Sequence, residues 1–295
     1  MRFFTAAYGE KYRLFCVGLV RSFADHLPGE TLHVATDDVP GLEKILWNNG
    51  VNPSSVGVYE LSRSDLDAWP IQAAPFRARN LRVIQKFCSR LPGNENVCWI
   101  DADALILADP RPYMERGKIN VIGHGIPPGG NELQEKRLGN QVVIPLRDYV
   151  IGCFWSMPAH LAIRMADLAI ARNQWSDKGV RSTVHQSVLN LVCKQNPGIV
   201  RRLDRLDEGL FWGLEAGHLH PQNKSIREFR MVDGEIWYRD RKVMQLHMPS
   251  TALGRNMQRR FVDWPDDVGA CLSTYWRSST GFPRAGAMPS PGLKT

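Results

Sequence analysis

Short apolar runs alternate with longer amphipathic stretches along the first hundred residues. The apolar runs at 2–6, 31–35, 56–59 and 96–100 predict strands, and the stretches at 11–26, 42–49 and 80–91 predict helices. The last of these helices has apolar residues at positions 81, 83, 84, 87 and 91, which is close to helical spacing. Strands that alternate with helices are typical of an α/β fold with a mainly parallel sheet.

The second half of the chain is less regular. A Gly- and Pro-rich run at 123–130 and the polar residues up to 141 predict a long loop of the kind that forms lids in enzymes. Beyond it we expect a strand at 149–156, helices at 159–172 and 183–194, two short strands at 231–233 and 236–238, and a last strand at 243–247. We predict one domain over 1–277, divided near residue 110, and a Pro-, Gly- and Ser-rich tail at 278–295 without regular structure.

The net charge narrows the choice of ligand. The chain has 37 Lys and Arg against 30 Asp and Glu, a formal charge of +7. This excess favours anionic ligands such as nucleotides, phospholipid surfaces or nucleic acid. The six cysteines are scattered without the close pairs of a zinc or redox site, so we expect buried thiols in a reducing compartment.

The hydropathy pattern contains no segment suited to a membrane. The apolar run at the amino terminus is too short for a signal-peptide core, and no apolar stretch approaches the roughly 20 residues of a transmembrane helix. We therefore expect a cytoplasmic protein without a transmembrane segment, bound to a membrane face at most peripherally.

Two carboxylates follow the most apolar predicted strand. Asp101 and Asp103 come directly after the apolar residues 97–100 (Val-Cys-Trp-Ile). In open α/β sheets, small molecules bind beyond the carboxyl ends of the strands, which is where these two residues are expected. Carboxylate oxygens are the ligands that hard divalent cations require. Asp65 and Asp67 have the same spacing but no apolar strand before them, so we interpret them as part of a turn or a helix cap. The apolar strand that precedes Asp101, and not the spacing of the aspartates, distinguishes Asp101 and Asp103 from Asp65 and Asp67.

Two other interpretations of Asp101 and Asp103 stay open. They could cap a turn, because Asp is common there and Asp109 and Pro110 mark another turn nearby. The segment also resembles that of haloacid-dehalogenase phosphatases, in which the first aspartate is a nucleophile. Their pattern usually continues through Gly to Thr, however, and this chain has Ala104 and Leu105 instead.

Residues 97–110, an apolar strand followed by Asp-Ala-Asp-Ala-Leu-Ile-Leu and then Asp-Pro, resemble the DxD segment of GT-A glycosyltransferases. The resemblance implies a Rossmann-like, mostly parallel sheet flanked by helices, with a smaller subregion on the acceptor side. It implies a nucleotide-binding half at 1–110 and a half at 111–277 that binds the acceptor and completes the metal site. It also implies that the protein binds Mn²⁺ or Mg²⁺ together with a nucleotide-sugar donor. A UDP-sugar is the expected donor.

The same resemblance points to residues that bind the donor. The first strand and the following loop, with Thr5, Ala6, Tyr8 and Tyr12, are similar to the part that holds the nucleotide base. The helix before the DxD strand carries basic residues where the family places one against the diphosphate: Arg77, Arg79, Arg82 and Lys86. The last three share one helix face by their spacing, although a solvated basic face would have the same pattern.

Two later segments extend the resemblance. Residues 184–190 resemble the helix start where retaining members carry Asp-Gln, which makes His185 and Gln186 candidate catalytic residues, with His185 in place of the Asp. A helix cap would explain His185 as well. Residues 244–250 resemble the late strand whose histidine completes the metal site in the glycogenin-like, family 8-like group, so His247 is the expected third ligand, against a buried structural histidine. Arg255 would bind phosphate.

Stereochemistry and acceptor are not fixed by the sequence. An inverting enzyme needs a carboxylate base, for which Asp148, Asp207, Glu208 and Glu215 are candidates, whereas a retaining enzyme needs none. The acceptor hydroxyl could belong to a glycan, a glycolipid or DNA with a hydroxymethylated base. A nucleotide-binding module without enzymatic activity is a further alternative.

Overall fold

The computed structural model describes residues 1–62, 75–123, 135–138, 142–171, 184–203, 209–213, 228–247 and 264–275. Several expectations lie outside these residues: those on Asp65 and Asp67, on Asp207, Glu208 and Glu215, on Arg255, and on the tail at 278–295.

Seven strands within the described residues form the main sheet. They are β1 (Arg2–Ala7), β2 (Leu32–Thr36), β3 (Val56–Glu60), β4 (Asn96–Ile100), β6 (Ile119–Gly123), β9 (Val150–Pro158) and β10 (Val200–Arg202), in the order β10-β6-β9-β4-β1-β2-β3. Neighbouring strands are parallel except that β9 runs antiparallel to both β4 and β6. The predicted α/β fold with a mainly parallel sheet is confirmed.

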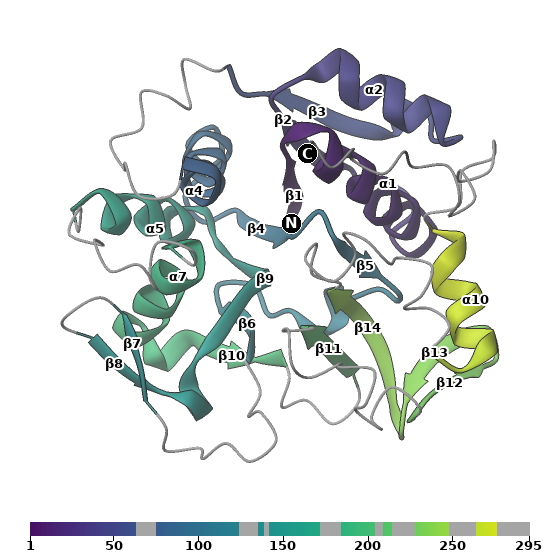
Figure 1. Cartoon of the computed structure of the whole chain (residues 1–295). Coiled ribbons are helices and arrows are strands. Elements are labelled where there is room, and N and C mark those ends of the chain that lie inside the picture. Colours follow the sequence, from purple (N-terminus) through teal and green to yellow (C-terminus); the bar gives the residue numbers. More distant parts are fainter. Residues whose placement is uncertain are drawn as a thin grey trace, which may run out of the picture.

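Helices cover both faces of this sheet (Figure 1). On one side lie α1 (Gly9–His26) and α2 (Val39–Asn48), and on the other lie α4 (Pro75–Cys88), α5 (Ala159–Ala171) and α7 (Val184–Gln195). Successive side chains of a strand point to opposite faces. In β1, Phe3 and Ala7 accordingly pack with the cluster under α1 and α2, and Phe4 and Ala6 pack with the cluster under the other three helices. Each face of the sheet therefore has its own apolar core.

A smaller sheet adjoins the main one. It contains β11 (Gly209–Gly213), β12 (Phe229–Val232), β13 (Glu235–Tyr238) and β14 (Arg241–His247), and the short strand β5 (Ala104–Ile106) pairs with β14. Helix α10 (Asp266–Thr274) packs beside this sheet, where Val268 and Leu272 join a third apolar cluster with Phe15 of α1 and Leu105 of β5. The second sheet thus packs against α1 through a core of its own.

The remaining described elements are short. A two-stranded sheet is formed by β7 (Glu135–Leu138) and β8 (Val142–Pro145), and the 3₁₀ turns are η1 (Pro53–Ser55), η2 (Arg111–Tyr113), η3 (Leu146–Asp148) and η4 (Pro197–Ile199). In the described parts of the chain, no helix combines the length and the apolar character needed to cross a membrane. All six cysteines are free thiols, five of them buried, as expected.

Several boundaries differ from the prediction. Helix α4 occupies Pro75–Cys88 and not 80–91, because proline is well tolerated in the first turn of a helix. The predicted loop up to residue 141 includes strand β7, whose polar sequence lacks an apolar alternation and forms a strand by pairing with β8. Strands β5, β6, β8, β10 and β11 and helix α10 were not predicted. Two of these strands, β5 and β10, have three residues each and leave almost no periodic signal.

Candidate metal and donor site

The pairing of β5 with β14 brings distant carboxylate and imidazole side chains together. The backbone N–H of Asp101, just after β4, donates to the carbonyl of Cys153 in β9 at 2.8 Å, and Ala104 N–H closes a turn onto the Asp101 carbonyl at 3.0 Å. The chain then enters β5, where Ala104 lies opposite His247 in β14. Asp101 therefore lies at the end of the main sheet, and Asp103 and His247 lie at the edge of the smaller one.

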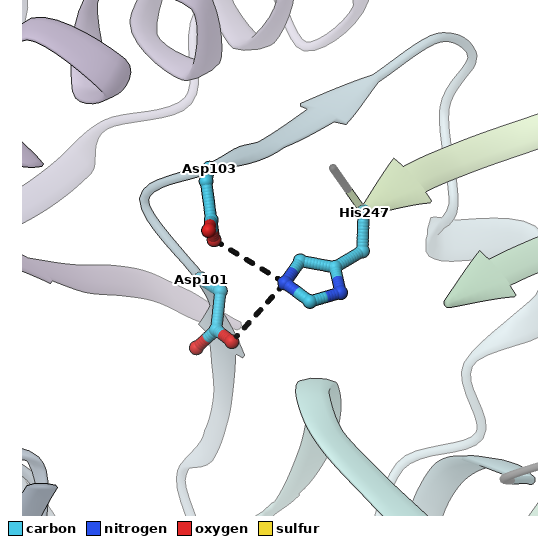
Figure 2. Close-up of side chains that lie close together, drawn as sticks. All are labelled: Asp101, Asp103 and His247. Atoms are coloured by element: carbon cyan, nitrogen blue, oxygen red, sulfur yellow. Dashed lines mark ion pairs between the residues drawn. The ribbon is translucent and has the colours of Figure 1, made fainter. Parts of the chain in front are cut away.

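These three side chains point toward one another (Figure 2). His247 Nε2 lies 3.2 Å from Asp103 Oδ1 and 3.6 Å from Asp101 Oδ2. One ligand atom from each residue lies within 4.8 Å of the others. Two carboxylate oxygens and one imidazole nitrogen form a donor set that suits Mn²⁺ and also accepts Mg²⁺. The residues present fit the expected divalent cation.

The imidazole of His247 is held in a strongly polar environment. Burial lowers its pKa, but the neighbouring Cys153 and Asp103 outweigh that effect and raise the pKa well above 6.5. Because a metal binds the neutral ring, a cation at these three side chains competes with a proton for His247 Nε2.

A layer of aromatic residues lies behind Asp101. Trp99 in β4 donates its indole N–H to Asp101 Oδ1 at 2.7 Å, and its ring stacks on that of Trp155 with centroids 6.4 Å apart. Trp155 in turn donates its indole N–H to Nε2 of His185 at 3.2 Å. Burial lowers the pKa of His185 to about 3. The predicted catalytic His185 is thus a buried, neutral hydrogen-bond acceptor behind the metal site, and a direct catalytic role for it stays a prediction.

The other two candidate catalytic residues lie in different surroundings. Gln186 accepts a hydrogen bond from Gly152 N–H at 3.2 Å and donates to the Tyr149 hydroxyl at 3.1 Å, so its amide holds the start of β9. Asp148 is exposed at the end of η3, with Oδ2 3.7 Å from Arg147 Nε. Their catalytic roles stay predictions.

Tyr8 and Arg79, both predicted to bind the donor, meet at the end of β1. The Arg79 guanidinium lies over the Tyr8 ring, 5.9 Å from its centroid. Burial raises the pKa of the Tyr8 hydroxyl, although Arg79 opposes the shift. Thr5 and Ala6 lie inside β1, paired with Val34 and Ala35 of β2, which agrees with the strand predicted at 2–6.

The remaining donor candidates among the described residues lie on α1 and α4. Tyr12 in α1 packs against the third apolar cluster, with its ring edge-on to Phe15 at 6.0 Å. Arg82 donates to Gln85 of its own helix at 2.7 Å, and Lys86 lies in the last turn of α4. Of the three basic residues at 79, 82 and 86, the described contacts connect Arg79 with the end of β1.

An ion cluster at the same edge of the sheet was missed by the sequence analysis. Arg13 in α1 bridges Asp37 at 2.9 Å and Asp38 at 3.1 Å, directly after β2, and Asp37 also accepts from Gly9 N–H at 3.1 Å. Asp37 and Asp38 could have been found by the criterion that identified Asp101 and Asp103, because each pair of aspartates follows an apolar strand. The cluster fixes the amino-terminal end of α1 beside Tyr8.

Comparison with the profiles of protein families gives no match, and comparison with the sequences of curated proteins gives none either. Solved structures do resemble the chain. The galactosyltransferase LgtC in complex with donor and acceptor sugar analogs is 12% identical, with a TM-score of 0.45 and coverage of 68% of this chain and 72% of that one. The bifunctional glycosyltransferase WbbM in its apo form is 10% identical, with a TM-score of 0.47 and coverage of 71% and 39%.

Mouse xyloside xylosyltransferase 1 in its apo form is 8% identical, with a TM-score of 0.44 and coverage of 68% of this chain and 84% of that one. All three are glycosyltransferases, the class that the sequence resemblance names. At these identities and TM-scores, the likeness by itself assigns no donor, acceptor or activity to this chain.

Proposed function

We propose that this chain is a metal-dependent glycosyltransferase of the GT-A type, which moves a sugar from a nucleoside-diphosphate sugar, UDP in the first instance, to a hydroxyl acceptor. One observation carries the proposal: Asp101, Asp103 and His247 converge at the junction of the two sheets, with ligand atoms within 4.8 Å of one another. The resemblance of residues 97–110 to the DxD segment supports the same conclusion.

The three side chains would hold Mn²⁺ or Mg²⁺ through Asp101 Oδ2, Asp103 Oδ1 and His247 Nε2. When bound, such a cation supplies Lewis-acid stabilisation of the departing nucleoside diphosphate. Three protein ligands are fewer than the roughly six that these cations take, so oxygen ligands of the donor have room to bind. The low exposure of Asp103, 8% for its side chain, limits competition from bulk water.

Tyr8 and Arg79 would bind the donor beyond the metal. Tyr8 lies at the carboxyl end of β1, and Arg79 of α4 lies over its ring. Sheets of α/β proteins bind ligands at the carboxyl ends of their strands. An aromatic ring offers a stacking surface for a base, and a guanidinium offers charge and directed N–H donors for phosphate oxygens. Thr5, Ala6 and Tyr12 nearby, together with Arg82, Lys86 and Arg255, are the further donor-binding candidates.

The acceptor side of the proposal concerns the base and the hydroxyl that receives the sugar. Asp148, an exposed carboxylate among the described residues, is one candidate base for an inverting reaction, and Asp207, Glu208 and Glu215 are the others. Gln186 and His185 would serve a retaining reaction. A glycan, a glycolipid at the membrane face of a cytoplasmic enzyme, or modified DNA would supply the hydroxyl. Binding to DNA would weaken steeply with salt, whereas binding to an uncharged sugar would not.

The direct test is a screen of UDP- and GDP-sugars for donor hydrolysis, with Mn²⁺ present and with a chelator as control. We expect Mn²⁺-dependent release of the nucleoside diphosphate from one donor, and none with the chelator. Metal-dependent nucleotide binding without hydrolysis or transfer would indicate a binding module. Release of phosphate from simple monoesters through a phosphorylated Asp101 would indicate the phosphatase alternative.

A pair of matched variants tests the site. Asp103→Asn removes a ligand charge at nearly constant shape, and we expect donor hydrolysis to fall by about 100-fold or more, the scale of lost electrostatic stabilisation. Asp109→Asn makes the same change six residues on, at a carboxylate that pairs with Arg111, and should keep the wild-type rate. Equal rates in the two variants would contradict the assignment of the site.

A further inference from the structure

The alternation of β4 places Trp99 and Asp101 on the same face of the chain, two residues apart. The indole Nε1 of Trp99 lies 2.7 Å from Asp101 Oδ1. This is the short end of the range for N–H donors, as is usual when the acceptor is a carboxylate. The hydrogen bond therefore couples a buried aromatic ring to the first residue of the metal cluster.

The Trp99 ring is held on several sides. It is 1% exposed, and Phe4 meets it edge-on with centroids 5.3 Å apart. Trp155 stacks on it at an interplanar angle of 9°, and His185 approaches its ring at 5.2 Å in an edge-on arrangement. A ring packed in this way has one rotamer, because any other would overlap its neighbours. The direction of its N–H is fixed by packing.

Asp101 is held both through its backbone and through its side chain. Its backbone N–H is bound to the Cys153 carbonyl, and its Oδ1 is bound to Trp99. The other oxygen, Oδ2, faces His247. Because Oδ1 accepts the hydrogen bond from the Trp99 indole, the carboxylate is oriented to offer a cation one oxygen, Oδ2, and not two.

We propose that Trp99 is a positioning residue, which fixes Asp101 as a single-oxygen ligand of the divalent cation. The inference rests on the proposed metal site and extends it to a residue that does not touch the metal. Groups that hydrogen-bond to metal ligands typically change metal affinity by about 10- to 100-fold when they are removed. Trp155 and His185 contact the Trp99 ring, and a phenylalanine at 155 would keep an aromatic ring against it.

The test compares Trp99→Phe with Trp155→Phe. Both variants replace a buried indole by a smaller ring, but Trp99→Phe removes the donor to Asp101 and Trp155→Phe removes the donor to His185. Mn²⁺ affinity is measured by electron paramagnetic resonance, which counts free Mn²⁺ in the presence of protein. We expect Kd to rise about 10- to 100-fold in Trp99→Phe and less than about 3-fold in Trp155→Phe.

The spectrum of bound Mn²⁺ provides a readout that simple loss of packing would not change. In Trp99→Phe the released Asp101 carboxylate can turn, so the line shape at saturating Mn²⁺ should differ from wild type. In Trp155→Phe the line shape should match wild type. Wild-type affinity and line shape in Trp99→Phe would overturn the role of Trp99 and leave the metal site intact. Absence of Mn²⁺ binding in the wild type would instead overturn the proposed metal site itself.

A second measurement covers the case in which Trp99→Phe does not fold. In wild-type protein with ¹⁵N-labelled tryptophan, one indole N–H signal should shift on addition of Mg²⁺. The same signal should move in Asp101→Asn, because the charge that the indole binds has been removed. If no indole signal responds to both changes, the inference is wrong.

Discussion

His185 is a polar side chain that the fold keeps neutral. It is buried against the rings of Trp99 and Trp155, and burial lowers its pKa to about 3. In the unfolded chain a histidine titrates near 6.5. Between these two values the unfolded state binds a proton that the folded state does not, so stability is lost as pH falls through 6.5 toward 3.

We expect this one group to cost the protein about 2 kcal/mol of unfolding free energy between pH 7.5 and pH 5. His185→Gln removes the titrating group, and its amide oxygen can still accept from Trp155. The variant should therefore lose about 2 kcal/mol less than wild type over that interval in urea unfolding experiments. An identical pH dependence in the two proteins would show that His185 is not held neutral.

Candidate site residues could be predicted from the sequence where an acidic residue directly follows a predicted apolar strand. Asp101 and Asp103 follow a strand of five buried residues, and the structure brings both side chains close to His247. Their role as metal ligands stays a prediction. The partner of each residue was not predictable. That Trp99 donates to Asp101, or that Trp155 engages His185, depends on side-chain rotamers fixed by packing and leaves no mark on spacing.

At the level of elements, strand β9 is held by helix α7 through the side chains of Asn190 and Gln186. Asn190 is buried, accepts from Val150 N–H at 2.8 Å and donates to the Val150 carbonyl at 2.8 Å. It also donates to the Gln186 carbonyl in its own helix. Because β9 supplies the Cys153 carbonyl that binds Asp101, this connection reaches the site.

Asn190→Ala should lower the unfolding free energy by about 2–4 kcal/mol, because it leaves a buried N–H and a buried carbonyl without their partner. The control is Asn196→Ala, near the end of the same helix, whose side chain makes one hydrogen bond, to the Val192 carbonyl, and is only half-buried. We expect that change to cost less than about 1 kcal/mol. Equal losses in urea unfolding would contradict this account of Asn190.

Helices and strands could be predicted where the pattern of apolar residues extends over enough positions to show its period. Strand β4 and the carboxyl end of α1 match the predicted positions. Strand β5 was not recognised, because its three residues lie inside a longer apolar run and form a strand only by pairing with β14. The smaller sheet depends on that pairing between distant parts of the chain.

At the level of the whole molecule, the candidate metal site joins the two sheets. Asp101 ends a strand of the main sheet, whereas His247 ends a strand of the smaller one. A cation that binds only the folded arrangement stabilises it in proportion to its occupancy. The site should therefore contribute to the stability of the entire fold and not only to catalysis.

Mn²⁺ at about one hundred times its Kd should raise the unfolding free energy by about 2.7 kcal/mol. Thermal melts in Mn²⁺ and in chelator would detect this as an increase of Tm by several degrees. Asp103→Asn should show no such increase, whereas Asp109→Asn should respond as wild type does. A metal effect that persists in Asp103→Asn would place the cation elsewhere.

The indole next to Asp101 gives the protein its own optical probe. The indole N–H of Trp99 donates a hydrogen bond to Asp101 Oδ1. Paramagnetic Mn²⁺ held by that carboxylate would quench the fluorescence of this ring, while diamagnetic Mg²⁺ would not. The identity of the bound cation could then be followed by light emission alone, without substrate and without a label.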